Sequence, residues 1–116
     1  MHDFRKLQVW RRARNTVVVA DRMTRQFPRT DHGVIAAQVR RAVISIPANI
    51  AEGCGRSSRK ETIRFLQIAR GSAAEAESHL EVASALSYVN ARQYEMLRSD
   101  LDAIQRMLNR LIEKLP

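Results

Sequence analysis

Residues 38–55, QVRRAVISIPANIAEGCG, decide the fold, because an amphipathic helix, a proline and two glycines fall within one short stretch. Pro47 lies inside the helical pattern and has no N–H for the carbonyl of Val43, so we predict a kink in the helix rather than its end. Ser45 and Asn49 flank the kink, and we expect their side chains to satisfy the carbonyls that it frees. Gly53 is predicted to end the helix in the left-handed conformation. The apolar residues at steps of three and four that define the helix are Ile35, Val39, Ala42, Ile46 and Ile50.

The segments on either side also have helical periodicity. A first helix is predicted from Asp3, as N-cap, to about Arg25, and Asp31 is the expected cap of the helix that contains Pro47. Ser58 and Glu61 are expected to form a capping box that opens a third helix, which extends to about Tyr88. A second capping pair, Asn90 and Gln93, precedes a fourth helix. The predicted packing stripe of the first helix is Trp10, Ala13, Val17, Ala20, Thr24 and Phe27, and that of the fourth is Tyr94, Leu97, Leu101, Ile104, Leu108, Leu111 and Leu115.

The third helix has two uncharged stripes on opposite sides. The first consists of Leu66, Ala69, Ala73, Ala76, Leu80 and Ala83, and it suits the core. The second includes Gly71, Ala74, Ser78 and Ala85, with Gln67 and Val89 on the same side. A glycine inside a helix costs about 1 kcal/mol relative to alanine, so Gly71 is easiest to explain if another backbone packs against it. We interpret the second stripe as a subunit interface; the alternative is a neutral surface exposed to solvent.

The 116 residues suffice for one domain with one core, and the whole chain, 1–116, is expected to form it. Short connections between four helices predict an all-α, antiparallel, up-down-up-down four-helix bundle. No apolar run approaches the roughly 20 residues of a membrane span. The charged amino terminus, with no apolar signal core after it, and the single cysteine, Cys54, favour a cytoplasmic protein without membrane contact.

Several motifs in order along the chain resemble those of a known family. They are FRKLQVWRRA near the amino terminus, the QFP turn, QVRRAVISIPANIAEGCGRSSRKE, IARGSAAEAESHL and the leucine-rich carboxyl end. Together they resemble the four-helix-bundle proteins encoded in 23S ribosomal RNA intervening sequences, a family that includes the accessory variability proteins of diversity-generating retroelements. The resemblance implies a homopentamer with a basic surface that binds nucleic acid, and in the retroelement branch also a reverse transcriptase. It implies no established enzymatic activity.

The charged residues that give the net charge of +8 are unevenly distributed along the chain. Residues 1–60 hold 13 Lys or Arg against 4 Asp or Glu, whereas residues 61–116 hold 7 against 8. A one-sided positive field attracts phosphate backbones, although it can also serve only to keep a surface solvated. We expect phosphate contacts, on RNA or DNA, from Arg11, Arg12, Arg40, Arg41, Arg56, Arg59 and Lys60.

Structural roles are the alternative to nucleic-acid contact for several residues. Ser57 and Ser58 open the third helix, where free N–H groups can receive an anion, but plain helix capping explains them equally well. Arg40 and Arg41 are adjacent, hence about 100 degrees apart on a helix, so at least one is expected at the surface. A salt bridge to Glu52 of a neighbouring subunit would also explain them. Trp10 and Tyr88 offer rings for base stacking, but Trp10 lies on a packing stripe, which favours the core.

The sequence has no cluster of reactive residues, so we predict no enzyme, no cofactor and no metal site. His2, His32 and His79 are too scattered to form a metal site with Cys54. His79 is expected to pair with Glu75 one turn away. The glycines around Cys54 lack the Gly-Lys-Ser/Thr of a phosphate-binding loop. Two functions remain: a basic homo-oligomer that binds nucleic acid, or an adaptor whose arginines meet an acidic partner such as a reverse transcriptase.

Overall fold

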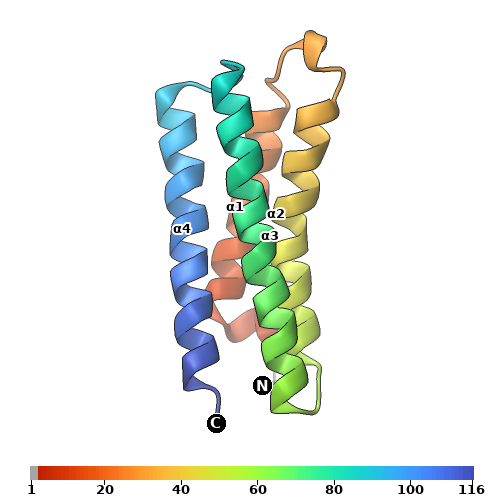
Figure 1. Ribbon diagram of the computed structural model, residues 1–116, viewed down its shortest axis with the longest axis vertical. Coiled ribbons are helices and arrows are strands. Elements are labelled where there is room, and N and C mark those ends of the chain that lie inside the picture. The colour runs from red at the N-terminus through yellow and green to blue at the C-terminus, as the bar shows by residue number, and fades with distance from the viewer. Residues whose placement is uncertain (1–2) are drawn as a thin grey trace.

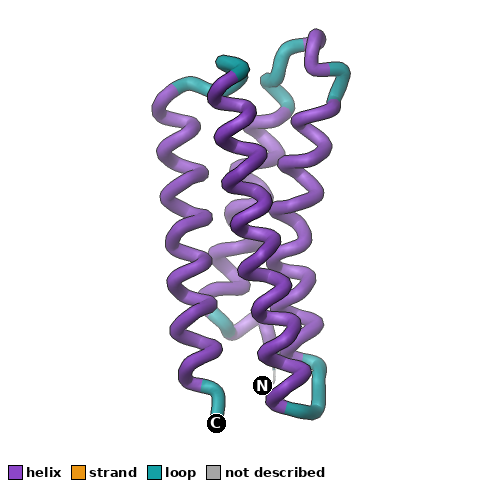
Figure 2. Tube along the Cα trace, viewed as in Figure 1, coloured by secondary structure: helices purple, strands orange, loops and turns teal. Residues whose placement is uncertain are grey.

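The computed structural model describes residues 3–116, and within that range it contains helices and no strand. The elements are η1 Phe4–Lys6, α1 Gln8–Thr24, η2 Arg29–Asp31, α2 Val34–Cys54, α3 Arg59–Ala85 and α4 Ala91–Lys114. Neighbouring helices run in opposite directions, as Figure 1 shows, and only short loops join them (Figure 2). The bundle measures 47 × 22 × 20 Å. The predicted all-α, up-down-up-down bundle is therefore confirmed.

Aliphatic side chains from all four helices fill the core. On α3, all six residues of the predicted core stripe are fully buried, and on α4 the same holds for Leu97, Leu101, Ile104 and Leu108. Helix α1 differs from its prediction by about one residue, because Trp10 and Val17 are only half-buried. Its buried face is Val9, Ala13, Thr16, Ala20, Met23 and Thr24.

The prediction of one continuous amino-terminal helix is wrong, because the segment forms two helices, η1 and α1. The Asp3 carboxylate accepts a hydrogen bond from the backbone N–H of Arg5 at 3.0 Å, and this caps the short helix η1. The same bond lowers the pKa of Asp3. Leu7 then has an extended backbone, so α1 begins only at Gln8. The Phe4 ring packs on the Trp10 ring, with 4.9 Å between centroids, which holds η1 against α1.

Asp31 acts as a cap from a more distant position than we had predicted. It lies in η2, and His32 and Gly33, both left-handed, separate it from α2. Its buried carboxylate accepts from the backbone N–H groups of Ile35 and Ala36 at 3.0 and 3.1 Å. The side chain therefore satisfies the amino end of α2, although the residue immediately before the helix is Gly33.

Helix α2 continues through Pro47, as predicted, and ends at Cys54. The Asn49 amide donates to the Ser45 carbonyl and hydroxyl at 2.8 and 3.0 Å, not to the carbonyl of Val43 that the proline frees. The Ser45 hydroxyl also contacts that of Ser72 on α3 at 2.8 Å. The contact between Ser45 and the buried Ser72 therefore joins α2 to α3.

Our prediction that Gly53 forms a left-handed cap is wrong. Gly53 is the second-last residue of α2, and Gly55 after it is right-handed, with φ −87°. A Cβ on Gly53 would lie 3.2 Å from both the Phe65 Cβ and the Thr62 carbonyl oxygen. The glycine is therefore needed because α3 approaches closely at this point.

The caps of α3 and α4 lie at the predicted residues. The capping box of α3 is only half formed, and α3 ends earlier than predicted. The Ser58 hydroxyl accepts from the N–H of Glu61 at 3.2 Å, which is one half of the expected capping box. Helix α3 ends at Ala85, three residues before Tyr88, and Ser87 follows with φ 63°. Asn90 and Gln93 form both halves of a capping box, at 2.8 and 2.9 Å.

Among residues 3–116, no helix combines the length and the apolar character that crossing a membrane requires.

Candidate nucleic-acid interface

One end of the bundle gathers basic residues from the loop between α2 and α3. The loop lies at the same end as both termini of the chain (Figure 1). Arg56, Arg59 and Lys60 are all exposed there. A hollow of about 310 Å³ opens beside them, lined by Arg56, Ser57, Ser58, Arg59, Thr62, Leu115 and Pro116. Three of the seven predicted phosphate contacts, together with both loop serines, are therefore neighbours in space.

Local hydrogen bonds hold this loop in shape. The Gly53 carbonyl accepts from the N–H of Arg56 at 3.2 Å and from the Thr62 hydroxyl at 3.0 Å. The Thr62 bond is buried, so it ties the end of α2 to the first turn of α3. Ser58 is engaged in capping, as its structural alternative required. The loop therefore presents its basic side chains from a fixed backbone.

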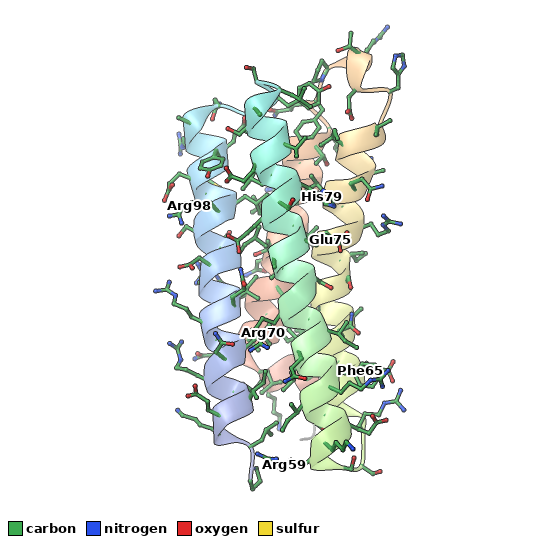
Figure 3. All side chains as sticks on the ribbon, in the orientation of Figure 1. Arg59, Phe65, Arg70, Glu75, His79 and Arg98 are labelled. Carbon is green, nitrogen blue, oxygen red and sulfur yellow. The ribbon has the colours of Figure 1, made fainter. Side chains whose placement is uncertain are left out.

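Arg56 is partly neutralised within the chain. It forms an ion pair with Glu52, and its guanidinium lies over the Phe65 ring, 4.8 Å from the centroid. Arg64 lies 5.1 Å from the centroid of the same ring and pairs with Glu61 at 3.5 Å. Glu52 therefore has a partner in its own chain, Arg56. Figure 3 labels Phe65 and Arg59 near this end of α3.

Arg59 and Lys60 have no carboxylate partner among residues 3–116. The Arg59 Nε donates only to the backbone carbonyl of Leu115, at 3.4 Å. Both residues belong to the first turn of α3, where backbone N–H groups add partial positive charge. The electrostatic attraction for an anion is therefore less compensated here than at Arg56.

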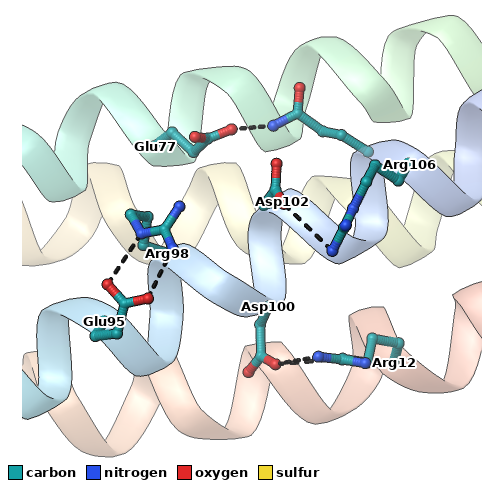
Figure 4. A network of polar contacts seen from close by, with 8 residues as sticks. Arg12, Glu77, Glu95, Arg98, Asp100, Asp102 and Arg106 are labelled. Atoms are coloured by element: carbon teal, nitrogen blue, oxygen red, sulfur yellow. Dashed lines mark hydrogen bonds and ion pairs between the residues drawn. The ribbon is translucent and has the colours of Figure 1, made fainter.

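The two arginines of α1 have different surroundings. Arg12 forms an ion pair with Asp100 of α4 at 2.8 Å, shown in Figure 4. Arg11 instead donates to the backbone carbonyl of Lys6 at 2.9 Å and has no ion pair among the described residues. Arg12 therefore joins two helices, whereas the charge of Arg11 stays uncompensated.

Arg40 and Arg41 lie in the first half of α2, away from the loop between α2 and α3 that follows its end. Arg41 is exposed, which confirms that at least one of the pair is at the surface, and it donates to Gln38 at 2.6 Å. Arg40 is half-buried and donates to the Thr24 hydroxyl of α1 at 3.1 Å. The structure does not bring this pair together with Arg56, Arg59 and Lys60.

Two of the four arginines of α4 are paired with acids on the same helix. Arg98 binds Glu95 at 2.7 Å and Arg106 binds Asp102 at 3.3 Å (Figure 4). The hydrogen bond from Arg98 also lowers the pKa of Glu95. Arg110 and Lys114 lack such a partner among residues 3–116, and both lie near the end of α4. Sequence reasoning missed them because the charge of residues 61–116 sums to nearly zero.

The second stripe of α3 is exposed in this chain. Gly71, Ala74, Ser78 and Ala85 all face solvent, and a Cβ on Gly71 would meet nothing within 4 Å. Two large apolar side chains of α3, Ile68 and Val82, are also 40% and 43% exposed. Among residues 3–116 of one chain, therefore, no backbone packs against Gly71.

The remaining reactive residues are dispersed. His79 and Glu75 pair at 3.3 Å, as predicted, and both are labelled in Figure 3. Burial raises the pKa of the Cys54 thiol. In the part of the chain that the structure describes, no three His, Cys, Asp or Glu side chains are placed to hold a metal ion. His2 lies outside the described residues. Tyr88 packs on Phe27, with 5.1 Å between ring centroids.

Comparisons with known proteins agree with this fold. A family model described as 23S rRNA-intervening sequence protein matches residues 5–110. A crystal structure of a protein with unknown function, from the S23 ribosomal protein family of Bacteroides thetaiotaomicron VPI-5482, is 28% identical and has a TM-score of 0.85. The match covers 91% of this chain and 99% of that one. No curated protein matches the chain. Since the family model spans nearly its whole length, the chain belongs to the 23S rRNA-intervening sequence protein family.

Proposed function

We propose that this protein is a non-enzymatic, homo-oligomeric binder of nucleic acid that contacts phosphates and does not read sequence strongly. The observation that carries the proposal is the pair Arg59 and Lys60 in the first turn of α3, exposed and without a carboxylate partner in the described chain. Phosphate oxygens suit arginine and lysine donors at such a position. Arg11, also uncompensated, adds a further contact from α1.

The other predicted arginines contribute in different degrees. Arg56 shares its charge with Glu52, so a phosphate has to compete with that carboxylate. Arg12 is held by Asp100, and Arg40 is held by Thr24. Exposed ion pairs are weak, about 0 to 1 kcal/mol, so a polyanion can displace them. We therefore expect Arg59, Lys60 and Arg11 to contribute most to affinity.

A homopentamer is the assembly that the family resemblance favours. The exposed stripe of α3, with Gly71, Ala74, Ser78 and Ala85, offers small residues that let a second helix approach closely. Such a ring would repeat the basic end in each subunit. Several weak phosphate contacts on one strand then act together and raise the overall affinity.

The test is binding of fluorescent RNA and DNA, single- and double-stranded, across a salt series, with the mass of the protein measured on the same sample by light scattering. We expect a multimer whose log affinity falls steeply against log salt. Replacing Arg56, Arg59 and Lys60 together by alanine should weaken binding and flatten that slope. The matched control replaces Arg22, Arg29 and Arg92, three exposed arginines near the opposite end of the bundle.

Two outcomes would count against the proposal. If both triple variants bind like the unaltered protein, the loop between α2 and α3 is not the contact. If a multimer forms but binds no strand at low salt, the basic surface serves a protein. An acidic partner such as a reverse transcriptase then becomes the leading candidate.

A further inference from the structure

A groove separate from the loop between α2 and α3 lies where α1 begins and α4 ends. Its volume is about 260 Å³. Both helix ends belong to the basic end of the bundle (Figure 1). Apolar side chains form its floor and cations its rim: the floor includes Leu7, Met107 and Leu111, and the rim consists of Lys6, Arg110 and Lys114.

The cations of the rim are not neutralised by any residue that the structure describes. None of Lys6, Arg110 and Lys114 forms an ion pair among residues 3–116, although seven other arginines do. Arg11, whose guanidinium binds the Lys6 carbonyl, adds a fourth cation beside the groove. Asp3 is paired with Arg5, and Glu113 does not line the groove. The groove therefore favours an anionic occupant.

The floor restricts what that anion is. Leu7, Met107 and Leu111 are half-buried and pack against the core, so each leaves part of its apolar surface accessible. A ligand that fills the groove needs an apolar face with negative groups beside it. An unstacked nucleobase with its flanking phosphates has this chemistry, and the thioether of Met107 makes favourable contacts with aromatic rings. A duplex keeps its bases paired and stacked.

We propose that this groove binds one unstacked nucleotide of a single-stranded RNA or DNA. The base lies on Leu7, Met107 and Leu111, and its flanking phosphates contact Lys6, Arg110 and Lys114. This inference rests on the proposed function and narrows it to single strands. It adds a second contact region to Arg59 and Lys60, on different helices.

The first experiment replaces Lys6, Arg110 and Lys114 together by alanine. It measures binding of a fluorescent single-stranded DNA of about twelve thymidine nucleotides across a salt series. Single-strand contacts each contribute about 0.7 to the salt slope, so we expect the slope to fall by about 2 and affinity at low salt to fall at least about tenfold. The control replaces Arg22, Arg29 and Arg92, which removes the same charge near the opposite end. A set of glutamine replacements at Lys6, Arg110 and Lys114 keeps long side chains, in case the alanine variant does not fold.

The second experiment tests the base directly. The unaltered protein is given an abasic strand of equal length and charge, and the same thymidine strand as a duplex. Because base stacking contributes to single-strand affinity, we expect the abasic strand to bind at least about fivefold more weakly and the duplex to bind more weakly still. Equal binding of normal and abasic strands would overturn the proposal, since phosphate contacts alone would then explain the affinity.

The remaining outcomes separate this inference from the proposed function. If the unaltered protein binds no strand at low salt, both fail. If it binds, but the Lys6, Arg110 and Lys114 variants behave like the control, only the groove is rejected. If poly-glutamate displaces the thymidine strand from the unaltered protein as effectively as unlabelled strand does, the bases add nothing to binding and the inference is overturned.

Discussion

The contact between α2 and α3 and the contact between α1 and α4 are built differently. Between α2 and α3, Gly53 leaves no room for a Cβ, and the hydroxyls of Ser45 and Ser72 lie 2.8 Å apart. Between α1 and α4, long polar side chains bridge the helices: Arg12 binds Asp100 at 2.8 Å, and Gln93 donates to Gln26 at 3.1 Å. Two grooves of about 260 Å³ each lie along this second contact.

The difference shows that residue size decides which helix contacts pack closely and which leave grooves. Small residues allow two helix backbones to approach, so the α2–α3 contact closes and excludes ligands. The α1–α4 contact has long side chains between the helices and a hollow near each end. The first contact therefore stabilises the fold, and the second provides space in which a ligand can bind.

The largest effect is expected for Leu66→Ala, next to Gly53 in the α2–α3 contact. Leu66 is fully buried, and its truncation leaves a cavity, so the free energy of unfolding should fall by about 2 to 5 kcal/mol. Urea denaturation measures it. Leu86→Ala is the control, because Leu86 is 48% exposed and its truncation should change stability by less than about 0.5 kcal/mol. Equal losses for the two variants would contradict the closed contact.

The next effect separates the two glycines. Gly53→Ala forces a Cβ to 3.2 Å from backbone and Cβ atoms of α3. Overpacking costs about 1 to 3 kcal/mol and the gain in helix propensity is about 1 kcal/mol, so a net loss of up to about 2 kcal/mol is expected. Gly71→Ala, with nothing within 4 Å, should instead stabilise a single chain by up to about 1 kcal/mol.

Light scattering on the Gly71→Ala variant sharpens this comparison. If the exposed α3 stripe is a subunit interface, the added methyl group should reduce assembly even while the helix itself becomes more stable. A variant that is both more stable and assembled to the same mass would place Gly71 outside the interface. If Gly53→Ala raised the free energy of unfolding, the close approach of α2 and α3 would be wrong.

A smaller effect is expected in the α1–α4 contact. A double-mutant cycle with Arg12→Ala and Asp100→Ala should give a coupling of about 0.2 to 1 kcal/mol, because both side chains are partly exposed and water screens the pair. The coupling should decrease as salt is raised. A coupling that does not respond to salt would mean that the pair acts by packing rather than by charge.

The smallest effect is a titration in the α3–α4 contact. The Tyr94 hydroxyl donates to Glu81, and this bond raises the pKa of Tyr94 above its usual value of 10. A raised folded-state pKa stabilises the fold below the unfolded pKa, and that contribution is lost as pH rises through the folded pKa. Ultraviolet titration of Glu81→Gln should show Tyr94 ionising at lower pH than in the unaltered protein. An unchanged titration curve would show that Glu81 does not cause the shift.

The sequence predicted the regular part of the fold well. The core stripes of α3 and α4 emerged from spacing, because Leu80 and Leu101 belong to long patterns of apolar residues. On α3 the opposite, uncharged stripe of Gly71, Ala74, Ser78 and Ala85 is the exposed one. The predicted stripe of α1 differs by about one residue from the buried face. Val9 and Thr16 have the same spacing as Trp10 and Val17, so spacing alone does not distinguish the two pairs. A buried threonine is hard to recognise in sequence, but the Thr16 hydroxyl is satisfied by the Arg12 carbonyl at 3.0 Å.

The candidate interface could be predicted only in part. Spacing in sequence brought Arg56, Arg59 and Lys60 together, because they belong to one loop and one helical turn. It gave no reason to separate Arg12 from Arg11, which differ only through Asp100, 88 residues away. It also missed Arg110 and Lys114, since their neighbour Lys6 comes from the other end of the chain.

By itself, the sequence determined which segments become helices, which face of α3 and of α4 is apolar, and where positive charge accumulates along the chain. These properties depend on residues within a few turns of one another, so local periodicity and capping report them. Only the tertiary structure decided why Gly53 is a glycine, which arginines are neutralised, and where a groove remains. Those properties depend on contacts between helices that are distant in sequence, and no local pattern encodes such distances.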